Sequence, residues 1–133
     1  MKPPAIPITD DHIHIDPVNG RGIEAAKDFR RSGGTHIFLV SKPSWSFGVE
    51  PSSGEDYREV FLATLCVADM VRETGLVVYP VLGIHPAEIN RLAARMSLEE
   101  AEKVRQESAA GSEESVAAGY LPRSVSLRPP TAF

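Results

Sequence analysis

The sequence predicts an α/β fold in which parallel strands alternate with helices, as part of a sheet or a barrel. Three apolar, strand-like runs begin near residues 6, 35 and 76, and a segment with helical spacing follows each of them. This order of elements is typical of parallel sheets and barrels, and the intervals leave room for right-handed crossovers. With 133 residues, 42% hydrophobic and 24% charged, the chain has the composition of one globular domain.

The first half of the chain predicts two strands and a short helix. A buried strand is expected from residue 6 to about residue 15, where proline, asparagine and glycine interrupt the pattern. Residues 22–31 carry apolar side chains at helical spacing, and the Ser-Gly-Gly sequence after them is a typical helix end. Residues 35–40 (THIFLV) predict a second strand, buried on both faces, and residues 41–54 predict a long loop.

The second half begins with the clearest helix, at residues 55–74, where apolar side chains recur at steps of three and four. A third strand is expected at residues 76–82. Pro80 lies within it and requires a position where its missing N–H has no partner in the sheet. After a loop, a capping box that begins at Ser97 predicts a helix to about Glu107.

The composition changes after Glu107. Residues 108–133 hold five serines and three prolines, with no aspartate, no histidine and no clear strand. We therefore divide the chain into a partial α/β domain at residues 1–107 and an irregular or disordered tail at residues 108–133. A reading frame lost near Ser108 is one explanation for the change.

Several classes of protein are excluded or disfavoured. A single cysteine, Cys66, allows no internal disulfide framework and indicates the reducing cytoplasm, and we expect a packed thiol and not a nucleophile. The net charge of -4 gives no overall basic field, and no apolar run approaches the roughly 18–20 residues of a membrane span. The chain also lacks a glycine-rich phosphate loop, a G-x-S-x-G elbow and a C-x-x-C pair.

The segment from Asp10 to Asp16, with the sequence DDHIHID, carries the most chemical information. In a strand, side chains alternate between faces, so His12 and His14 point the same way, roughly 7 Å apart along the backbone. Two imidazoles placed in this way can bind one divalent metal, and the two aspartates on the same face can orient an imidazole or help to hold the ion. A chance pair of surface histidines is the simpler alternative.

A second histidine motif, GIHP at residues 83–86, follows the third predicted strand. His85 therefore lies at the carboxyl-terminal edge of the sheet, where His14 also ends the first strand. Active sites of α/β sheets and barrels collect at this edge. A glycine–proline turn with an incidental histidine is the alternative.

Five further side chains are weaker candidates. His36 opens the second strand, at the end opposite to the histidine motifs, and we expect it to be structural or exposed. Trp45 and Phe47 lie in the loop after that strand and either cover a substrate or pack within the loop. Lys42 and Arg91, near the same edge, either bind a phosphate or remain solvated surface charges.

The DxHxHxD pattern on a first strand, followed by GIHP after a third, resembles the TatD family over about residues 6–107. This resemblance implies the N-terminal portion of a (β/α)8 TIM barrel, truncated, in the amidohydrolase superfamily of metal-dependent hydrolases, whose characterised members act as deoxyribonucleases. The loop from Ser41 to Gly54 resembles an archaeal-type branch of unproven substrate.

The resemblance also implies roles for individual residues. His12 and His14 would be ligands of the first metal in a two-metal centre, and the metal could be Zn, Mn, Ni or Mg. His85 would correspond to the histidine near the phosphate of a DNA or other phosphoester substrate. Asp16 matches a motif position to which we assign no role, and no catalytic residue is identified.

The chain departs from the family pattern in its second half. The family's complete site also takes a glutamate, two histidines and an aspartate from later strands, whereas here the late acids are Glu107, Glu113 and Glu114. About three and a half of eight strand–helix units are present, so we expect this chain to be inactive alone. Two alternatives therefore stay open, a non-catalytic α/β interaction module and an amidohydrolase that acts on a C–N bond.

Overall fold

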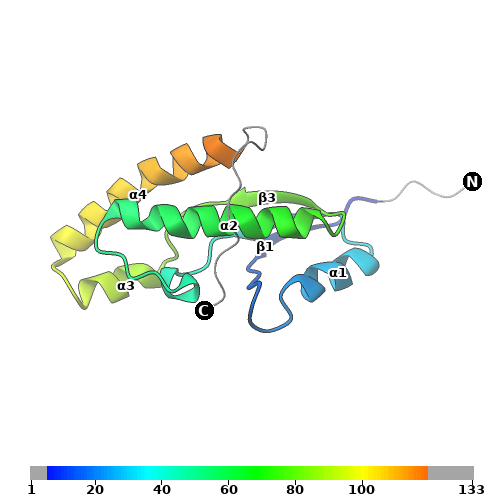
Figure 1. Cartoon of the computed structure of the whole chain (residues 1–133), viewed down its shortest axis with the longest axis horizontal. Helices are drawn as coiled ribbons and strands as arrows, with labels where there is room; N and C mark the ends of the chain where they lie inside the picture. Colours follow the sequence, from blue (N-terminus) through cyan, green and yellow to red (C-terminus); the bar gives the residue numbers. More distant parts are fainter. Residues whose placement is uncertain (1–5, 120–133) are drawn as a thin grey trace, which may run out of the picture.

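The predicted fold class is confirmed by the computed structural model, which describes residues 6–119 (Figure 1). Three parallel strands form one sheet in the order β1-β2-β3, and α-helices follow each strand. The bounds of these elements are β1 Thr9–Ile13, α1 Ile23–Arg31, β2 His36–Val40, α2 Tyr57–Arg72, β3 Val77–Val81, α3 Ala87–Ala93 and α4 Leu98–Gly119. This arrangement is that of a partial TIM barrel.

One face of the sheet is covered by helices α1 and α2. Because side chains alternate along a strand, Ile37, Leu39 and Val78 all point to this face and are at most 3% exposed. They pack against Ala26 of α1 and a row of small apolar side chains on α2. Burying each large apolar side chain contributes about 1.5–3 kcal/mol, so this cluster fixes how α2 lies on the sheet.

The opposite face of the sheet is open in the described part of the chain. It carries large apolar side chains that are between 37% and 44% exposed, namely Phe38, Val77, Tyr79 and Val81. Phe38 and Tyr79 contact each other, with ring centroids 5.1 Å apart. In a closed barrel this face would line the interior, so the second strand is buried on one face only and not on both as its sequence predicts.

A second hydrophobic cluster lies beyond the carboxyl end of the sheet. Here Tyr57 and Phe61 of α2 pack against Leu92 of α3 and against Ala101 and Val104 of α4. Figure 1 shows α4 alongside α2 and α3 on this side of the molecule. The cluster therefore positions the loops that follow β2 and β3.

The main correction concerns the fourth helix. The capping box at Ser97 forms as predicted, since its side-chain oxygen accepts the N–H of Glu100 and the Glu100 carboxylate accepts the N–H of Ser97. Helix α4, however, continues to Gly119, so residues 108–119 are helical and not irregular. The composition change at Ser108 therefore falls within a helix. Residues 120–133 lie outside the described residues.

Smaller differences affect β1 and α3. Strand β1 is shorter than predicted, and its register with β2 shifts between Asp10 and Ile13, so His14 lies just beyond the strand end. The short helix α3 was absent from the prediction. Pro80 pairs in register with Leu39, and β3 is an edge strand of the described sheet, as the missing N–H requires.

Within residues 6–119, no helix combines the length and the apolar character that crossing a membrane requires.

Candidate functional site

His12 and His14 meet at the carboxyl end of β1. Their Nε2 atoms are 3.3 Å apart, and their rings meet edge to face with centroids 5.1 Å apart. Two imidazole nitrogens on one tetrahedral zinc, each about 2.0–2.1 Å from the ion, stand about 3.4 Å apart. The predicted common orientation of the two rings is present, and their spacing matches that of two ligands of a single ion.

The main chain of β2 fixes the orientation of His14. Its Nδ1 lies 3.0 Å from the carbonyl oxygen of Val40, which can only accept a hydrogen bond. In the neutral ring Nδ1 therefore carries the proton, and Nε2 is left with a free lone pair. A metal-binding histidine is commonly oriented in this way by a carbonyl or carboxylate on its other nitrogen.

His85 lies next to this pair, at the same edge of the sheet. Its ring centroid is 5.9 Å from that of His14, although 71 positions separate the two residues in the sequence. The N–H of Ala87 donates to His85 Nδ1 over 3.1 Å, so the neutral ring keeps its proton on Nε2. His85 can therefore donate a hydrogen bond to a phosphate oxygen while His14 offers a lone pair.

The two aspartates of the motif do not join the histidines. Asp10 Oδ1 accepts the N–H of His12 over 3.1 Å, which is a local turn contact. Asp16 accepts the backbone N–H groups of Val18 and Asn19 and forms an ion pair with Lys42. The expectation that Asp16 orients an imidazole or holds the ion is therefore not supported by its position, and Lys42 is not left for a phosphate.

These contacts shift the pKa of the Asp16 carboxyl group. Burial alone would raise the pKa of this carboxyl, but the hydrogen bond from Lys42 and the two backbone N–H groups outweigh it. Together they hold the pKa of Asp16 well below its ordinary value, so the carboxylate stays charged at neutral pH. The ion pair between Asp16 and Lys42 therefore connects the loop after β1 to the end of β2.

The donor set of the described residues is smaller than a hydrolytic metal centre needs. Among residues 6–119, no three His, Cys, Asp or Glu side chains gather as a metal site. Such a centre typically has three protein ligands and an open position. The Nε2 atoms of His12 and His14 have the spacing of two such ligands, and the Val40 carbonyl leaves the Nε2 lone pair of the neutral His14 ring free.

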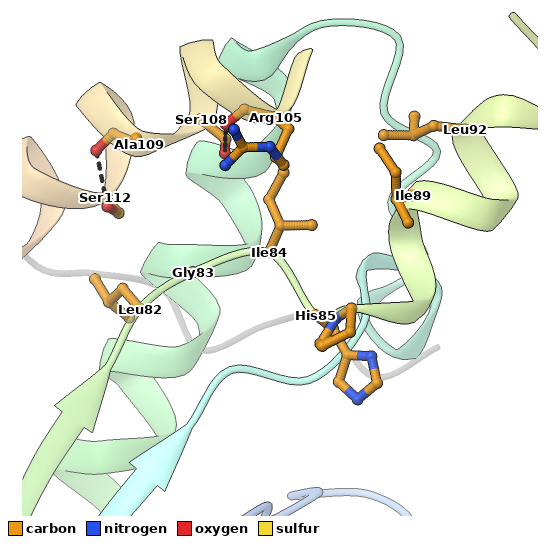
Figure 2. A pocket seen from close by; sticks show the side chains of 11 residues that line it. Leu82, Gly83, Ile84, His85, Ile89, Leu92, Arg105, Ser108, Ala109 and Ser112 are labelled. Carbon is orange, nitrogen blue, oxygen red and sulfur yellow. Dashed lines mark hydrogen bonds between the residues drawn. The ribbon is translucent and has the colours of Figure 1, made fainter. Parts of the chain in front are cut away.

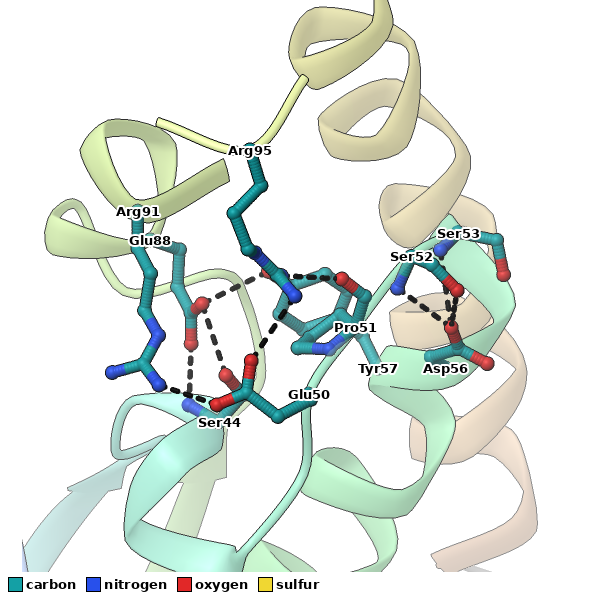
Figure 3. Close-up of polar contacts among 10 residues, drawn as sticks. All are labelled: Ser44, Glu50, Pro51, Ser52, Ser53, Asp56, Tyr57, Glu88, Arg91 and Arg95. Atoms are coloured by element: carbon teal, nitrogen blue, oxygen red, sulfur yellow. Dashed lines mark hydrogen bonds and ion pairs between the residues drawn. The ribbon is translucent and has the colours of Figure 1, made fainter. Parts of the chain in front are cut away.

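Glu88, on the first turn of α3, connects the loops around this edge (Figure 3). Its side chain is buried, and its carboxylate accepts hydrogen bonds from the backbone N–H and the hydroxyl of Ser44 and from the hydroxyl of Tyr57. Burial, together with the Glu88 charge, raises the pKa of Tyr57, which therefore stays protonated. Sequence reasoning missed Glu88 because the helix that carries it was not predicted.

Trp45 and Arg91 form a pair at the rim of the same edge. The Arg91 guanidinium lies over the indole, 4.8 Å from the ring centroid, and also pairs with Glu50. Trp45 is 37% exposed, whereas Phe47 is buried in the second cluster. The two aromatic residues of this loop thus have different roles, since Phe47 packs and Trp45 faces solvent.

The other sequence candidates lie elsewhere. His36 is at the opposite end of β2, where Nδ1 contacts the Thr35 hydroxyl at 2.6 Å and the ring stacks with Tyr79. Cys66 is buried on α2, and burial, with a smaller contribution from the Asp69 charge, raises the pKa of its thiol. Neither residue is placed to act at the histidine edge.

A pocket of about 440 Å³ lies behind the GIHP loop, between that loop and helices α3 and α4 (Figure 2). Its walls are mainly apolar, formed by Leu82, Ile84, Ile89 and Leu92, while His85 lies at one end. Arg105 also lines it, with its guanidinium paired to Glu102. The pocket thus lies next to His85, on the side of helices α3 and α4 and not on the open face of the sheet.

Comparison with known proteins gives two matches. Residues 9–119 match the protein family described as TatD related DNase. The chain is also 33% identical over 100 residues to a Methanocaldococcus jannaschii protein that carries the name Uncharacterized protein MJ1127. That match covers 74% of this chain and 33% of the archaeal protein, so the chain spans about a third of that relative's length. No solved structure matches the chain significantly.

Proposed function

The chain belongs to the TatD-related DNase family, and we propose that it is part of a metal-dependent hydrolase that cleaves phosphodiester bonds of a nucleic acid. The arrangement of His12, His14 and His85 carries the proposal. Two Nε2 atoms 3.3 Å apart have the spacing of ligands to one ion, and the third imidazole lies beside them.

Each histidine has a defined part in the proposed chemistry. His12 and His14 would hold the ion, and the Val40 carbonyl keeps the lone pair of His14 Nε2 directed at it. The Nε2–H of His85 would donate a hydrogen bond to a phosphate oxygen. A divalent ion bound there would supply an activated water and stabilise negative charge on the phosphodiester.

The extent of the chain shapes what we expect of it alone. It covers about a third of the archaeal relative, and no group of three metal-binding side chains forms among the described residues. Two imidazoles bind a divalent ion more weakly than three or four ligands do. We therefore propose weak metal binding for this chain and assign hydrolysis to a complete barrel.

The open sheet face favours one other candidate function. Phe38 and Tyr79 expose apolar surface that a soluble protein ordinarily covers. A non-catalytic module that completes its sheet with a partner polypeptide would use this face and would not need the histidine pair.

Titration of the purified chain with Zn²⁺ or Mn²⁺, followed by calorimetry, tests the metal half-site. We expect saturable binding that is lost in the His12→Ala, His14→Ala double variant. His36→Ala is the matched control, because it removes an imidazole from the opposite end of β2 and should leave binding unchanged.

Two outcomes would overturn the proposal. One is a folded wild-type chain that binds no ion, which would favour the interaction module. The other is binding that the double variant retains, since the ion would then sit elsewhere on the chain.

A further inference from the structure

Trp45 is the single tryptophan of the chain, and it is partly exposed at the edge of the sheet that carries the histidines. It belongs to a short 3₁₀ helix, Ser44–Phe47, at the carboxyl edge of the sheet. In this turn Ser44 and Phe47 are buried, whereas Trp45 is 37% exposed and lies outside both hydrophobic clusters of the described chain. The turn therefore presents an indole to solvent on a rigid backbone.

One face of the indole is already supported by a cation. The Arg91 guanidinium lies 4.8 Å from the ring centroid, and its ion pair with Glu50 holds it there. An exposed cation–π contact of this kind favours one orientation of the ring. The exposed area of Trp45 thus belongs to a ring whose orientation is restrained before any ligand arrives.

Two partly exposed arginines lie near Trp45. Arg91 and Arg95 share the exposed carboxylate of Glu50, so these three side chains together carry a charge of +1, while the Glu88 carboxylate that balances it is buried beneath them (Figure 3). Arg95 also donates to the Pro51 carbonyl, which holds its guanidinium against the same loop. An aromatic ring beside a positive cluster is the combination with which proteins bind single-stranded nucleic acid, because bases stack on the ring and phosphates meet the charge.

Trp45 is also tied to the candidate site. The buried Glu88 carboxylate accepts the N–H and hydroxyl of Ser44, the residue before Trp45, while the N–H of Glu88 donates to the His85 carbonyl over 2.9 Å. A short chain of hydrogen bonds therefore connects the turn that carries Trp45 to the histidine next to the metal half-site. A ligand that contacts both Trp45 and His85 would therefore find the two residues in a fixed relative position.

We propose that Trp45, supported by Arg91, is a stacking platform for an unpaired base of a nucleic-acid strand, and that it sets that strand in register with His85. This inference deepens the proposed function and rests on it for the identity of the substrate. The platform itself requires no metal, because the indole and the guanidinium are held by protein contacts alone.

The direct test is quenching of Trp45 fluorescence, which reports on one site because the chain has one tryptophan. A short oligothymidylate is titrated into the chain in the presence of EDTA, beside an abasic oligonucleotide of equal length that keeps the phosphates and lacks the bases. We expect saturable quenching by the first and little by the second. Equal quenching by both, or none by either, would overturn the platform.

Variants provide a second, independent readout through the anisotropy of a labelled oligothymidylate. Trp45→Leu removes the ring and should weaken binding about tenfold or more, whereas Trp45→Phe should retain most of it. Tyr79→Leu is the matched control, since it removes an aromatic ring of similar exposure, 44% against 37%, from the open sheet face. Wild-type affinity in Trp45→Leu, or an equal loss in Tyr79→Leu, would overturn the assignment.

Failure of the two proposals can be told apart. Stacking in EDTA without metal binding by His12 and His14 would overturn the proposed hydrolase and leave the platform as a metal-independent binding site. Metal binding without stacking would leave the hydrolase and overturn the platform.

Discussion

Asp16 and Lys42 are charged residues that have a structural role, although their charges would also suit a metal ion or a phosphate. Each lies near the histidine edge, yet the two pair with each other, and their side chains are 18% and 19% exposed. The Asp16 carboxylate also accepts two backbone N–H groups, so it closes the turn after β1. Sequence parity correctly placed His12 and His14 together, but it cannot reveal that a lysine 26 positions later neutralises Asp16.

The pairing of Asp16 makes stability depend on pH. Because its folded-state pKa lies below the unfolded value of about 3.9, the stabilisation is present above that value and is lost as pH falls toward the folded pKa. We expect Asp16→Asn to lower the free energy of unfolding by about 1–3 kcal/mol at about pH 7, and by less at about pH 3. Urea denaturation at both pH values measures this difference.

Glu24→Gln is the control, because the ion pairs of Glu24 with Lys27 and Arg31 are exposed and the change should alter stability by less than about 0.5 kcal/mol. A wild-type advantage over Asp16→Asn that stays constant from neutral to acid pH would contradict the assignment.

Helix α4 is longer than its sequence predicts. The capping box predicts its start, but the part of the helix after Glu107 mixes serines and glycines, which disfavour a helix, with four alanines and two glutamates, which favour one. Packing supports the helix here, because Val104 and Ser108 are buried and a Cβ added at Gly111 would lie 3.8 Å from the Phe61 ring. Such packing between α4 and α2 cannot be seen in a single segment of sequence.

The contact between α4 and the turn before α2 predicts a sharp difference between two glycines. A Cβ on Gly54 would lie 2.2 Å from the Glu107 Cβ and 2.7 Å from backbone atoms of α4, whereas a Cβ on Gly83 meets nothing within 4 Å. We expect Gly54→Ala to destabilise the chain by about 1–3 kcal/mol, since α4 must shift, and Gly83→Ala to cost little. The urea midpoints of the two variants give the comparison, and equal midpoints would show that α4 does not pack here.

At the scale of the whole molecule, the strand–helix alternation is sufficient to predict a parallel α/β fold. The strand intervals and the apolar runs are local properties of the sequence, and the structure confirms three parallel strands. The assembly of the site is different, because His14 and His85 meet only after β1 and β3 take their places on either side of β2. Among the described residues, no group of three or more His, Cys, Asp or Glu side chains could hold a metal ion.

The open sheet face predicts self-association of the isolated chain. Phe38 and Tyr79 present adjacent apolar rings on one side of the sheet. We expect the sedimentation coefficient of the wild type to rise with concentration and that of the Phe38→Lys, Tyr79→Lys variant to stay constant. Val18→Lys is the control, because Val18 is 53% exposed but lies outside this face, and it should behave as the wild type does. If the sedimentation coefficients of all three chains depend on concentration in the same way, this face does not cause self-association.

The contact between His14 and Val40 has a consequence for mutational tolerance. The acceptor is a main-chain carbonyl, so every side chain at position 40 that preserves β2 also preserves the hydrogen bond that selects the tautomer of His14. A carboxylate in the same role could be lost by a single substitution. The fold therefore determines which nitrogen of the neutral His14 ring carries the proton, and substitutions of the Val40 side chain do not change it.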